Sequence, residues 1–199
     1  MFSLARIPAR IDAIVLGASA GGAEALGVLL AGLPAHTVAS LFVVLHLPRN
    51  RPSLLVEIFA KRCALKLREA QDKEPVAAGT VYFAPPDYHM LIDDGPSIAL
   101  SVDDPVCFSR PAIDPLFESA AAVYRDRLLG IILTGANEDG AAGLRAVHDA
   151  GGLAIVQDIA SAKSSYMPAA AKRSVPAAAE LTLEEVRNLL QTLKTEVTA

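Results

Sequence analysis

Three residues of types that act together in nucleophilic catalysis, Ser19, His46 and Asp139, each follow an apolar stretch of the sequence. A serine hydroxyl is a weak nucleophile until a base takes its proton, and histidine is an effective base when an acid orients its ring. The apolar stretches at 12–17, 41–45 and 128–133 are typical of buried strands. If these strands are parallel, their carboxyl ends meet at one edge of a sheet, where open α/β sheets bind ligands. We therefore expect the three side chains to lie together there.

The serine lies in Gly17-Ala-Ser19-Ala-Gly21-Gly22, a G-x-S-x-G pattern between a predicted strand and a predicted helix. Small neighbours permit a sharp turn that exposes the hydroxyl, and the backbone N–H of Ala20 can help to hold an oxyanion. Gly-rich loops at this place also bind phosphate, so a phosphate-binding α/β domain is an alternative. However, no Lys follows the glycines, and the second strand ends in His46 instead of the acid expected at a dinucleotide site.

Spacing alone does not select the acid that orients His46. Asp158 also follows a predicted strand, and Asp139 has the alternative role of capping its own helix. The order Ser, His, Asp differs from the Ser, acid, His order of α/β-hydrolases, so an ordinary member of that class is not expected. A further histidine, His89, lies in a predicted hairpin near Pro85-Pro86, where it either borders a site or has a structural role.

Apolar stretches alternate with helical patterns along most of the chain, which predicts an α/β fold: a doubly wound, mainly parallel sheet with helices on both faces. The middle of the chain differs, with short strands at 80–83, 88–92 and 97–102. A turn at 93–96 between the last two predicts an antiparallel edge hairpin. Asp114-Pro115 is typical of an N-cap followed by the first helical position, and Thr182-Leu-Glu-Glu185 is a capping box.

The composition limits the class of protein. The chain has 199 residues, 52% of them hydrophobic and 20% charged, with a net charge of -4. This excludes a disordered chain and argues against a dedicated nucleic-acid binder. Cys63 and Cys107 show no zinc-ligand spacing, so we expect two reduced, buried thiols and no metal. No signal peptide or membrane span is apparent, which predicts a cytoplasmic protein without membrane insertion. We expect a loose arm at 1–10 and a single domain at 11–199.

Several motifs, in order along the chain, resemble the catalytic domain of the chemotaxis protein-glutamate methylesterase family, CheB. The matching segments are Gly17–Leu26, Leu45–Pro48, Glu69–Asp72, Ala84–Met90, Ser109–Asp114, Leu133–Leu144, Gln157–Asp158 and Met167–Pro168. The resemblance implies hydrolysis of glutamate γ-methyl esters on the signalling helices of chemoreceptors, with methanol as the product. Some members also deamidate receptor glutamines.

The resemblance also assigns roles to residues of this sequence. It makes Ser19 the nucleophile that forms an acyl-enzyme, His46 the general base and Asp139 the acid that orients His46. The oxyanion would be held by the backbone N–H groups of Ala20 and Ala136. No cofactor or metal is implied. For substrate binding we expect Arg110, able to pair with acidic groups on a receptor helix, and His89, which could border the site.

Some features depart from the family pattern. Ala20 and Ala136 stand where Thr and Met are frequent, which changes side chains around the site but keeps the backbone donors. The family usually carries an N-terminal phospho-receiver domain, and only about ten residues precede the first predicted strand here. We therefore expect a stand-alone catalytic domain, either constitutively active or controlled by a separate regulatory protein; a piece of a longer protein is the third alternative. A non-catalytic module that docks on receptor helices is a further alternative.

Overall fold

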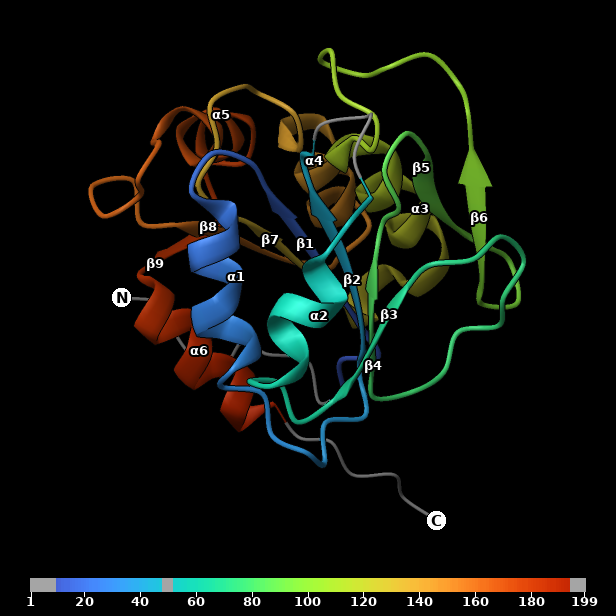
Figure 1. Cartoon of the computed structure of the whole chain (residues 1–199). Helices are drawn as coiled ribbons and strands as arrows, with labels where there is room; N and C mark the ends of the chain where they lie inside the picture. The colour runs from blue at the N-terminus through green and yellow to red at the C-terminus, as the bar shows by residue number, and fades with distance from the viewer. Residues whose placement is uncertain (1–9, 48–51, 194–199) are drawn as a thin grey trace.

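The computed structural model describes residues 10–47 and 52–193, and at its centre lies a seven-stranded sheet whose neighbouring strands all run parallel (Figure 1). The strand order is β3-β4-β2-β1-β7-β8-β9. Their bounds are β1 Ala13–Ala18, β2 Ser40–Leu45, β3 Lys66–Glu69, β4 Thr80–Phe83, β7 Leu128–Ile132, β8 Leu153–Gln157 and β9 Ala179–Leu181. The chain builds outward from β1 on one side and from β7 on the other. The switch point between these two strands is where such sheets bind ligands.

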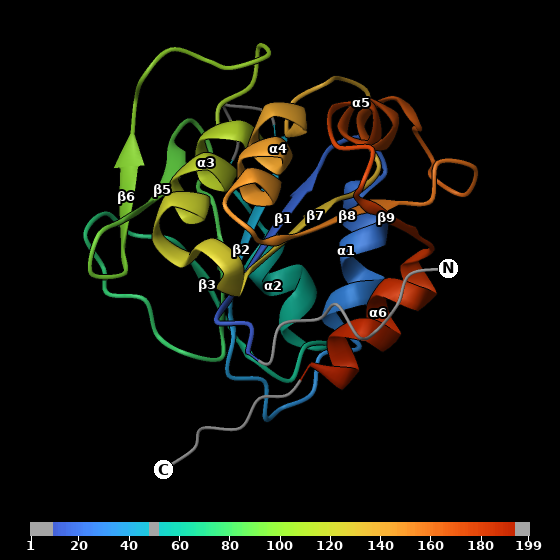
Figure 2. The ribbon, with the colours of Figure 1, turned by 180° about the vertical axis from the view of Figure 1, so that it is seen from behind.

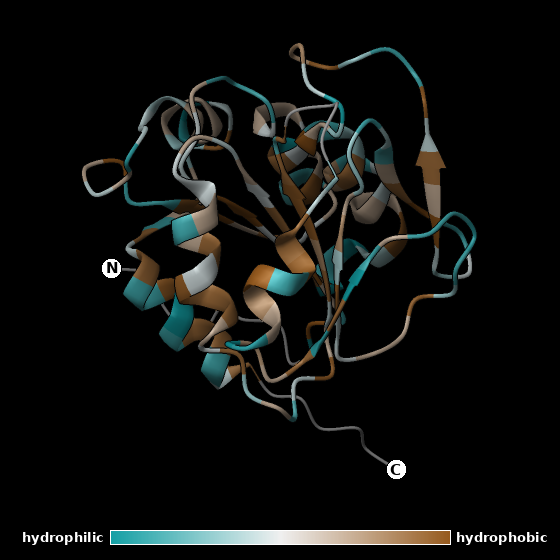
Figure 3. Cartoon of the chain, viewed as in Figure 1, coloured by the Kyte–Doolittle hydropathy of each residue, from teal (hydrophilic) through white to brown (hydrophobic). Residues whose placement is uncertain are grey.

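Helices cover both faces of this sheet, as Figures 1 and 2 show from opposite sides. One face carries α1 Gly22–Leu30, α2 Leu55–Ala60 and α6 Leu183–Thr192, and the other carries α3 Ile113–Tyr124, α4 Ala141–Asp149 and α5 Tyr166–Ser174. Because both faces are covered, β1, β2 and β7 are buried along their whole length, which explains their continuous apolar sequences. Figure 3 shows these central strands as hydrophobic. The predicted fold class is confirmed.

The predicted hairpin is also present, formed by β5 His89–Asp93 and β6 Ser97–Ser101. It stands as a separate two-stranded sheet, because β4 pairs with β2 and β3 in the main sheet instead. Its buried side chains Met90, Ile92 and Ile98 pack in one core with α3. The backbone N–H of Ile92 also donates to Ser119 Oγ of α3, at 3.1 Å. The hairpin therefore fixes α3, and the start of α3 in turn contacts Asp139 at the carboxyl edge of the sheet.

Two local predictions at helix starts had different outcomes. The capping box of α6 is confirmed, since Thr182 and Glu185 bond reciprocally. The predicted N-cap at Asp114 is wrong, because α3 already begins at Ile113 and its N-cap residue is Ala112. The carboxylate of Asp114 accepts a hydrogen bond from the N–H of Gly143 at 2.6 Å, so it serves the neighbouring helix α4.

Apart from Arg10, the predicted arm at 1–10 lies outside the described residues. Within the described ranges, no helix is long and apolar enough to cross a membrane. The same ranges contain no group of three or more His, Cys, Asp or Glu placed to hold a metal ion. Cys63 and Cys107 are both free thiols, but both are only partly buried, so the prediction of buried thiols is wrong.

Candidate active site

Ser19 follows β1 directly, in the tight turn that leads into α1. Gly21 has a left-handed backbone with φ of 80°, and the N–H of Gly22 donates to the carbonyl of Ser19 at 2.8 Å. A Cβ atom at Gly22 would lie 2.6 Å from the side chain of Leu45 and 2.7 Å from Ala18, so only glycine fits there. The N–H of Ser19 donates to the carbonyl of Thr134 at 2.9 Å, which ties the turn to the segment after β7.

His46 stands beside Ser19 because β1 and β2 are parallel neighbours. Ala18 pairs with Leu45, and the N–H of His46 donates to the carbonyl of Ala18 at 3.1 Å. The register therefore continues into the two residues that follow the strands. The His46 side chain is 11% exposed, and its Nε2 lies 2.8 Å from Oδ2 of Asp139.

Asp139 is fully buried. It lies just before α4 but is held by the start of α3. Its Oδ2 accepts the N–H of Ile113 at 2.6 Å, and its Oδ1 accepts the N–H of Asp114 at 3.0 Å. Both donors belong to the first turn of α3, while Gly140 is the N-cap residue of α4. The first-turn N–H groups of a helix favour a negative group, so α3 fixes the carboxylate that faces His46.

These contacts define which nitrogen of His46 carries the lone pair. A carboxylate oxygen only accepts hydrogen bonds, so Nε2 carries a proton and the neutral ring has its lone pair on Nδ1. The hydroxyl of Ser109 lies 3.3 Å from Nδ1. Ser109 was not among the candidate site residues drawn from the sequence, although it begins the matching segment Ser109–Asp114, because that match assigned no role to its hydroxyl. Contact with His46 arises only because the segment before α3 folds over the carboxyl edge.

Of the two predicted oxyanion donors, Ala20 follows Ser19 directly, and Ala136 lies two residues after Thr134, whose carbonyl accepts the N–H of Ser19. Ala20 and Ala136 are both exposed, and no residue in the described ranges accepts a hydrogen bond from either backbone N–H. Gly135 is held firmly, because its N–H donates to Ser164 and its carbonyl accepts from Met167. Added bulk at Gly135 is excluded, since a Cβ atom would lie 2.4 Å from Sδ of Met167. Two N–H groups are thus free to bind an oxyanion.

The two residues predicted for substrate binding make internal contacts. Arg110 pairs with Asp87 at 2.9 Å and donates to the carbonyls of Val102 and Asp103. His89 is 2% exposed, and its Nε2 lies 3.2 Å from the carbonyl of Asp104. Its Nδ1 accepts the N–H of Ala112, also at 3.2 Å. Arg110 and His89 therefore both hold the segment between β6 and α3.

Burial and neighbouring acids change the protonation of two groups near the triad. Burial raises the pKa of Asp114 to about 6, and the Asp139 carboxylate adds to this rise. Burial, followed by the charges of Asp139, Asp114 and Glu138, raises the pKa of the Cys107 thiol. Cys107 therefore stays a neutral thiol at physiological pH and is a poor nucleophile.

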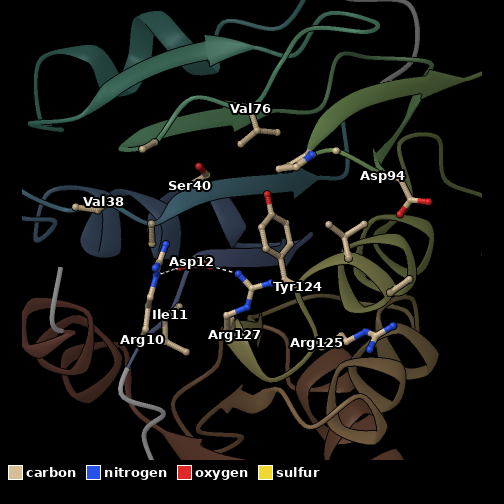
Figure 4. A pocket seen from close by; sticks show the side chains of 16 residues that line it. Arg10, Ile11, Asp12, Val38, Ser40, Val76, Asp94, Tyr124, Arg125 and Arg127 are labelled. Atoms are coloured by element: carbon tan, nitrogen blue, oxygen red, sulfur yellow. Dashed lines mark hydrogen bonds and ion pairs between the residues drawn. The ribbon is translucent and has the colours of Figure 1, made fainter. Parts of the chain in front are cut away.

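The alternative acid, Asp158, bonds within its own turn, where its Oδ1 accepts the N–H of Ser161 at 2.9 Å. A cavity of about 770 Å³ lies at the opposite, amino end of the strands (Figure 4). There Arg10 and Arg127 both form ion pairs with Asp12. Burial and the nearby Asp12 carboxylate raise the pKa of Tyr124 to about 12, which keeps its hydroxyl protonated. This cavity contains none of the predicted catalytic residues.

A His–Asp pair beside a serine, with free N–H groups at the switch point of a doubly wound sheet, is the arrangement found in serine hydrolases. The model of the CheB methylesterase family matches residues 14–190, so the chain belongs to this family of hydrolases.

Individual proteins agree with this assignment. A provisionally named protein-glutamate methylesterase/protein-glutamine glutaminase from Leptospira interrogans is 42% identical, over 89% of this chain and 92% of that protein. Protein-glutamate methylesterase/protein-glutamine glutaminase 2 from Caulobacter vibrioides is 38% identical over 88% of this chain, which spans only 52% of that relative. The crystal structure of the Thermotoga maritima CheB methylesterase catalytic domain superposes with a TM-score of 0.86 at 30% identity, covering 90% of this chain and 97% of that one.

Proposed function

We propose that this chain is a serine esterase that hydrolyses γ-methyl esters of glutamate side chains on chemoreceptors in the cytoplasm and releases methanol. The names of the Leptospira and Caulobacter relatives support the substrate class. The observation that carries the mechanism is the 2.8 Å contact between Nε2 of His46 and Oδ2 of Asp139 beside Ser19.

In this mechanism the hydroxyl of Ser19 attacks the ester carbonyl while Nδ1 of His46 takes its proton. The N–H groups of Ala20 and Ala136 hold the oxyanion of the tetrahedral intermediate. His46 then protonates the departing methoxide, which leaves as methanol and gives an acyl-enzyme. Water attacks the acyl group with His46 again as the base, and a free glutamate carboxylate leaves. Asp139 keeps the proton on Nε2 and stabilises the imidazolium at each transfer.

Ser109 has a defined place in this sequence. His46 Nδ1 has a single lone pair, and the Ser109 hydroxyl lies 3.3 Å from it. The Ser109 hydroxyl must therefore turn away before Ser19 can transfer its proton. The same residues can hydrolyse a glutamine amide, with ammonia in place of methanol, which accords with the glutaminase in the relatives' names.

The test is methanol release from a methylated cytoplasmic fragment of a chemoreceptor by the wild type, Ser19→Ala and Ser109→Ala. Loss of the nucleophile should lower the rate by about 10⁴-fold or more. Ser109→Ala is the matched control, since it removes the other hydroxyl near His46 and should keep activity within about tenfold of the wild type. Activity that survives Ser19→Ala but is lost in Ser109→Ala would assign the nucleophile to Ser109. Methanol release at the same background rate from all three proteins would refute the proposed esterase activity.

A further inference from the structure

The segment 102–112, here called the rim loop, crosses the carboxyl edge of the sheet between β6 and α3 (Figures 1 and 2). Side chains hold its backbone at several points. Arg110 donates to the carbonyls of Val102 at 2.6 Å and Asp103 at 3.0 Å. The His89 ring contacts the carbonyl of Asp104, and Nδ2 of Asn137 donates to the carbonyl of Cys107 at 3.3 Å. The loop is therefore a fixed structure beside the active site.

The tip of the rim loop is a two-residue turn in an unfavourable backbone conformation. Val106 and Ser109 exchange backbone hydrogen bonds of 3.2 and 2.9 Å. Between them Cys107 has φ of 47° and Phe108 has φ of 63°, both in the left-handed region. Turns of this kind favour Asn, Asp and Gly, because a side chain with a Cβ atom is strained there.

The same turn exposes a large apolar side chain. Phe108 is 99% exposed, so its ring gains no burial that would offset the strained backbone. Strain at a held turn, combined with a fully exposed phenyl ring, points to a role outside the folded chain itself. The next residue, Ser109, has its hydroxyl 3.3 Å from Nδ1 of His46, so Phe108 directly precedes a residue that contacts His46.

Other exposed aromatic side chains lie around the same edge. In the described ranges, Tyr88 is 42% exposed and Tyr166 is 52% exposed, and Phe108 is the third exposed aromatic residue. Tyr88 follows Asp87, whose N–H donates to the carbonyl of Arg110 at the base of the rim loop. Tyr166 precedes Met167, whose N–H donates to the carbonyl of Gly135, next to Ala136. The three aromatic residues thus lie on both sides of the site.

We propose that Phe108 is the anchor by which the enzyme docks the polypeptide that carries the esterified glutamate, with Tyr88 and Tyr166 at the border of this surface. This inference rests on the proposed function, because it takes a protein as the substrate. Phe108 packs against an apolar side chain close to the glutamate. On a helix, that side chain lies three or four residues away, since such positions are about 5–6 Å apart. Aromatic residues are frequent among the few side chains that dominate binding.

The experiment compares two substrates with Phe108→Ala, Phe108→Leu and the wild type. One substrate is the methylated cytoplasmic fragment of a chemoreceptor, and the other is the γ-methyl ester of N-acetylglutamate amide, which has no polypeptide. Phe108→Ala should raise KM for the fragment about tenfold or more and leave kcat/KM for the small ester within about twofold. Phe108→Leu should restore part of the affinity. The control is Ile58→Ala, which removes an apolar side chain that is 56% exposed on α2 and should change neither value.

A second readout separates docking from folding. Phe108→Gly removes the ring and relieves the left-handed backbone, so it should unfold at the same or a higher temperature while binding the fragment more weakly. Binding is measured directly by fluorescence anisotropy of a labelled fragment, in a Ser19→Ala background so that no ester is hydrolysed.

The outcomes distinguish this inference from the proposed function. An unchanged KM and unchanged binding in Phe108→Ala would overturn the docking role, as would an equal loss of activity on the small ester. A fragment that does not bind even with Phe108 present would also overturn it. Failure of the esterase itself would appear elsewhere, as equal rates for the wild type and Ser19→Ala on the small ester.

Discussion

Replacement of Asp139 by Asn tests the arrangement of the site most directly. The carboxylate accepts three hydrogen bonds, from Nε2 of His46 and from the N–H groups of Ile113 and Asp114. At 2.8 Å, and with an effective dielectric constant of 20, a carboxylate stabilises an imidazolium by about 6 kcal/mol. Since each tenfold change in rate corresponds to about 1.4 kcal/mol, loss of the charge should lower kcat/KM by about 10⁴-fold.

The same change should lower the free energy of unfolding. An amide has one oxygen, which can occupy the position of Oδ2 and keep the bonds from His46 and Ile113. Its NH₂ group then faces the N–H of Asp114, which leaves that donor without a partner at a cost of about 1–3 kcal/mol. The two remaining bonds lose their ionic character and weaken. We expect a total loss of about 2–4 kcal/mol.

The assay is methanol release from the methylated receptor fragment, with urea unfolding of each protein at the assay temperature. Asp158→Asn is the matched control, because this acid also follows a strand and its carboxylate accepts a hydrogen bond from Ser161 in its own turn. It should change kcat/KM by about twofold or less. A folded Asp139→Asn protein that loses less than about tenfold in kcat/KM would refute the reasoning, since Asp139 would then merely hold the start of α3.

Two further changes follow from the same contacts. The pKa of Asp114 is raised to about 6, so the folded state binds its proton more tightly and loses stability as pH rises from about 4 through 6. Asp114→Asn should remove this loss of stability. The unfolding temperature of the variant relative to the wild type should therefore be higher at pH 7 than at pH 4, and an equal difference at both pH values would contradict the prediction. His89→Ala leaves the N–H of Ala112 without its acceptor. This variant should lower the free energy of unfolding, measured in urea, by about 1–3 kcal/mol and should reduce activity. A change in the free energy of unfolding of less than about 0.5 kcal/mol would show that His89 does not hold the rim loop.

The sequence predicts the central sheet well because its strands are buried on both faces. β1 and β7 consist of apolar residues and glycine, and β2 is apolar after Ser40, a pattern typical of parallel strands that are buried on both faces. β3 is different, because Lys66–Glu69 is a polar edge strand with little apolar signal. β9 has only three residues, and both strands depend on pairing with the sheet. Their positions are therefore set by tertiary contacts.

The placement of Ser19, His46 and Asp139 could be predicted because each follows a strand of the same parallel set. The contacts that hold these three side chains in place could not be predicted. The N–H groups that donate to Asp139 belong to the start of α3, and Ser109 belongs to the rim loop. The positions of these groups therefore depend on how the β5–β6 hairpin packs against α3. The turn at Cys107 and Phe108 gave no signal either, because it lacks the Gly or Asn typical of left-handed turns.

The contacts of His89 explain why the site depends on a part of the chain outside the main sheet. The ring contacts Asp104, near the start of the rim loop, and Ala112, at its end. Ala112 is the N-cap residue of α3, whose first turn holds Asp139, and the rim loop itself carries Ser109 to His46. One buried imidazole on the hairpin therefore helps to hold the two segments that contact His46. The parallel sheet places the proposed nucleophile and base at one edge, and the hairpin with α3 holds the groups that orient His46.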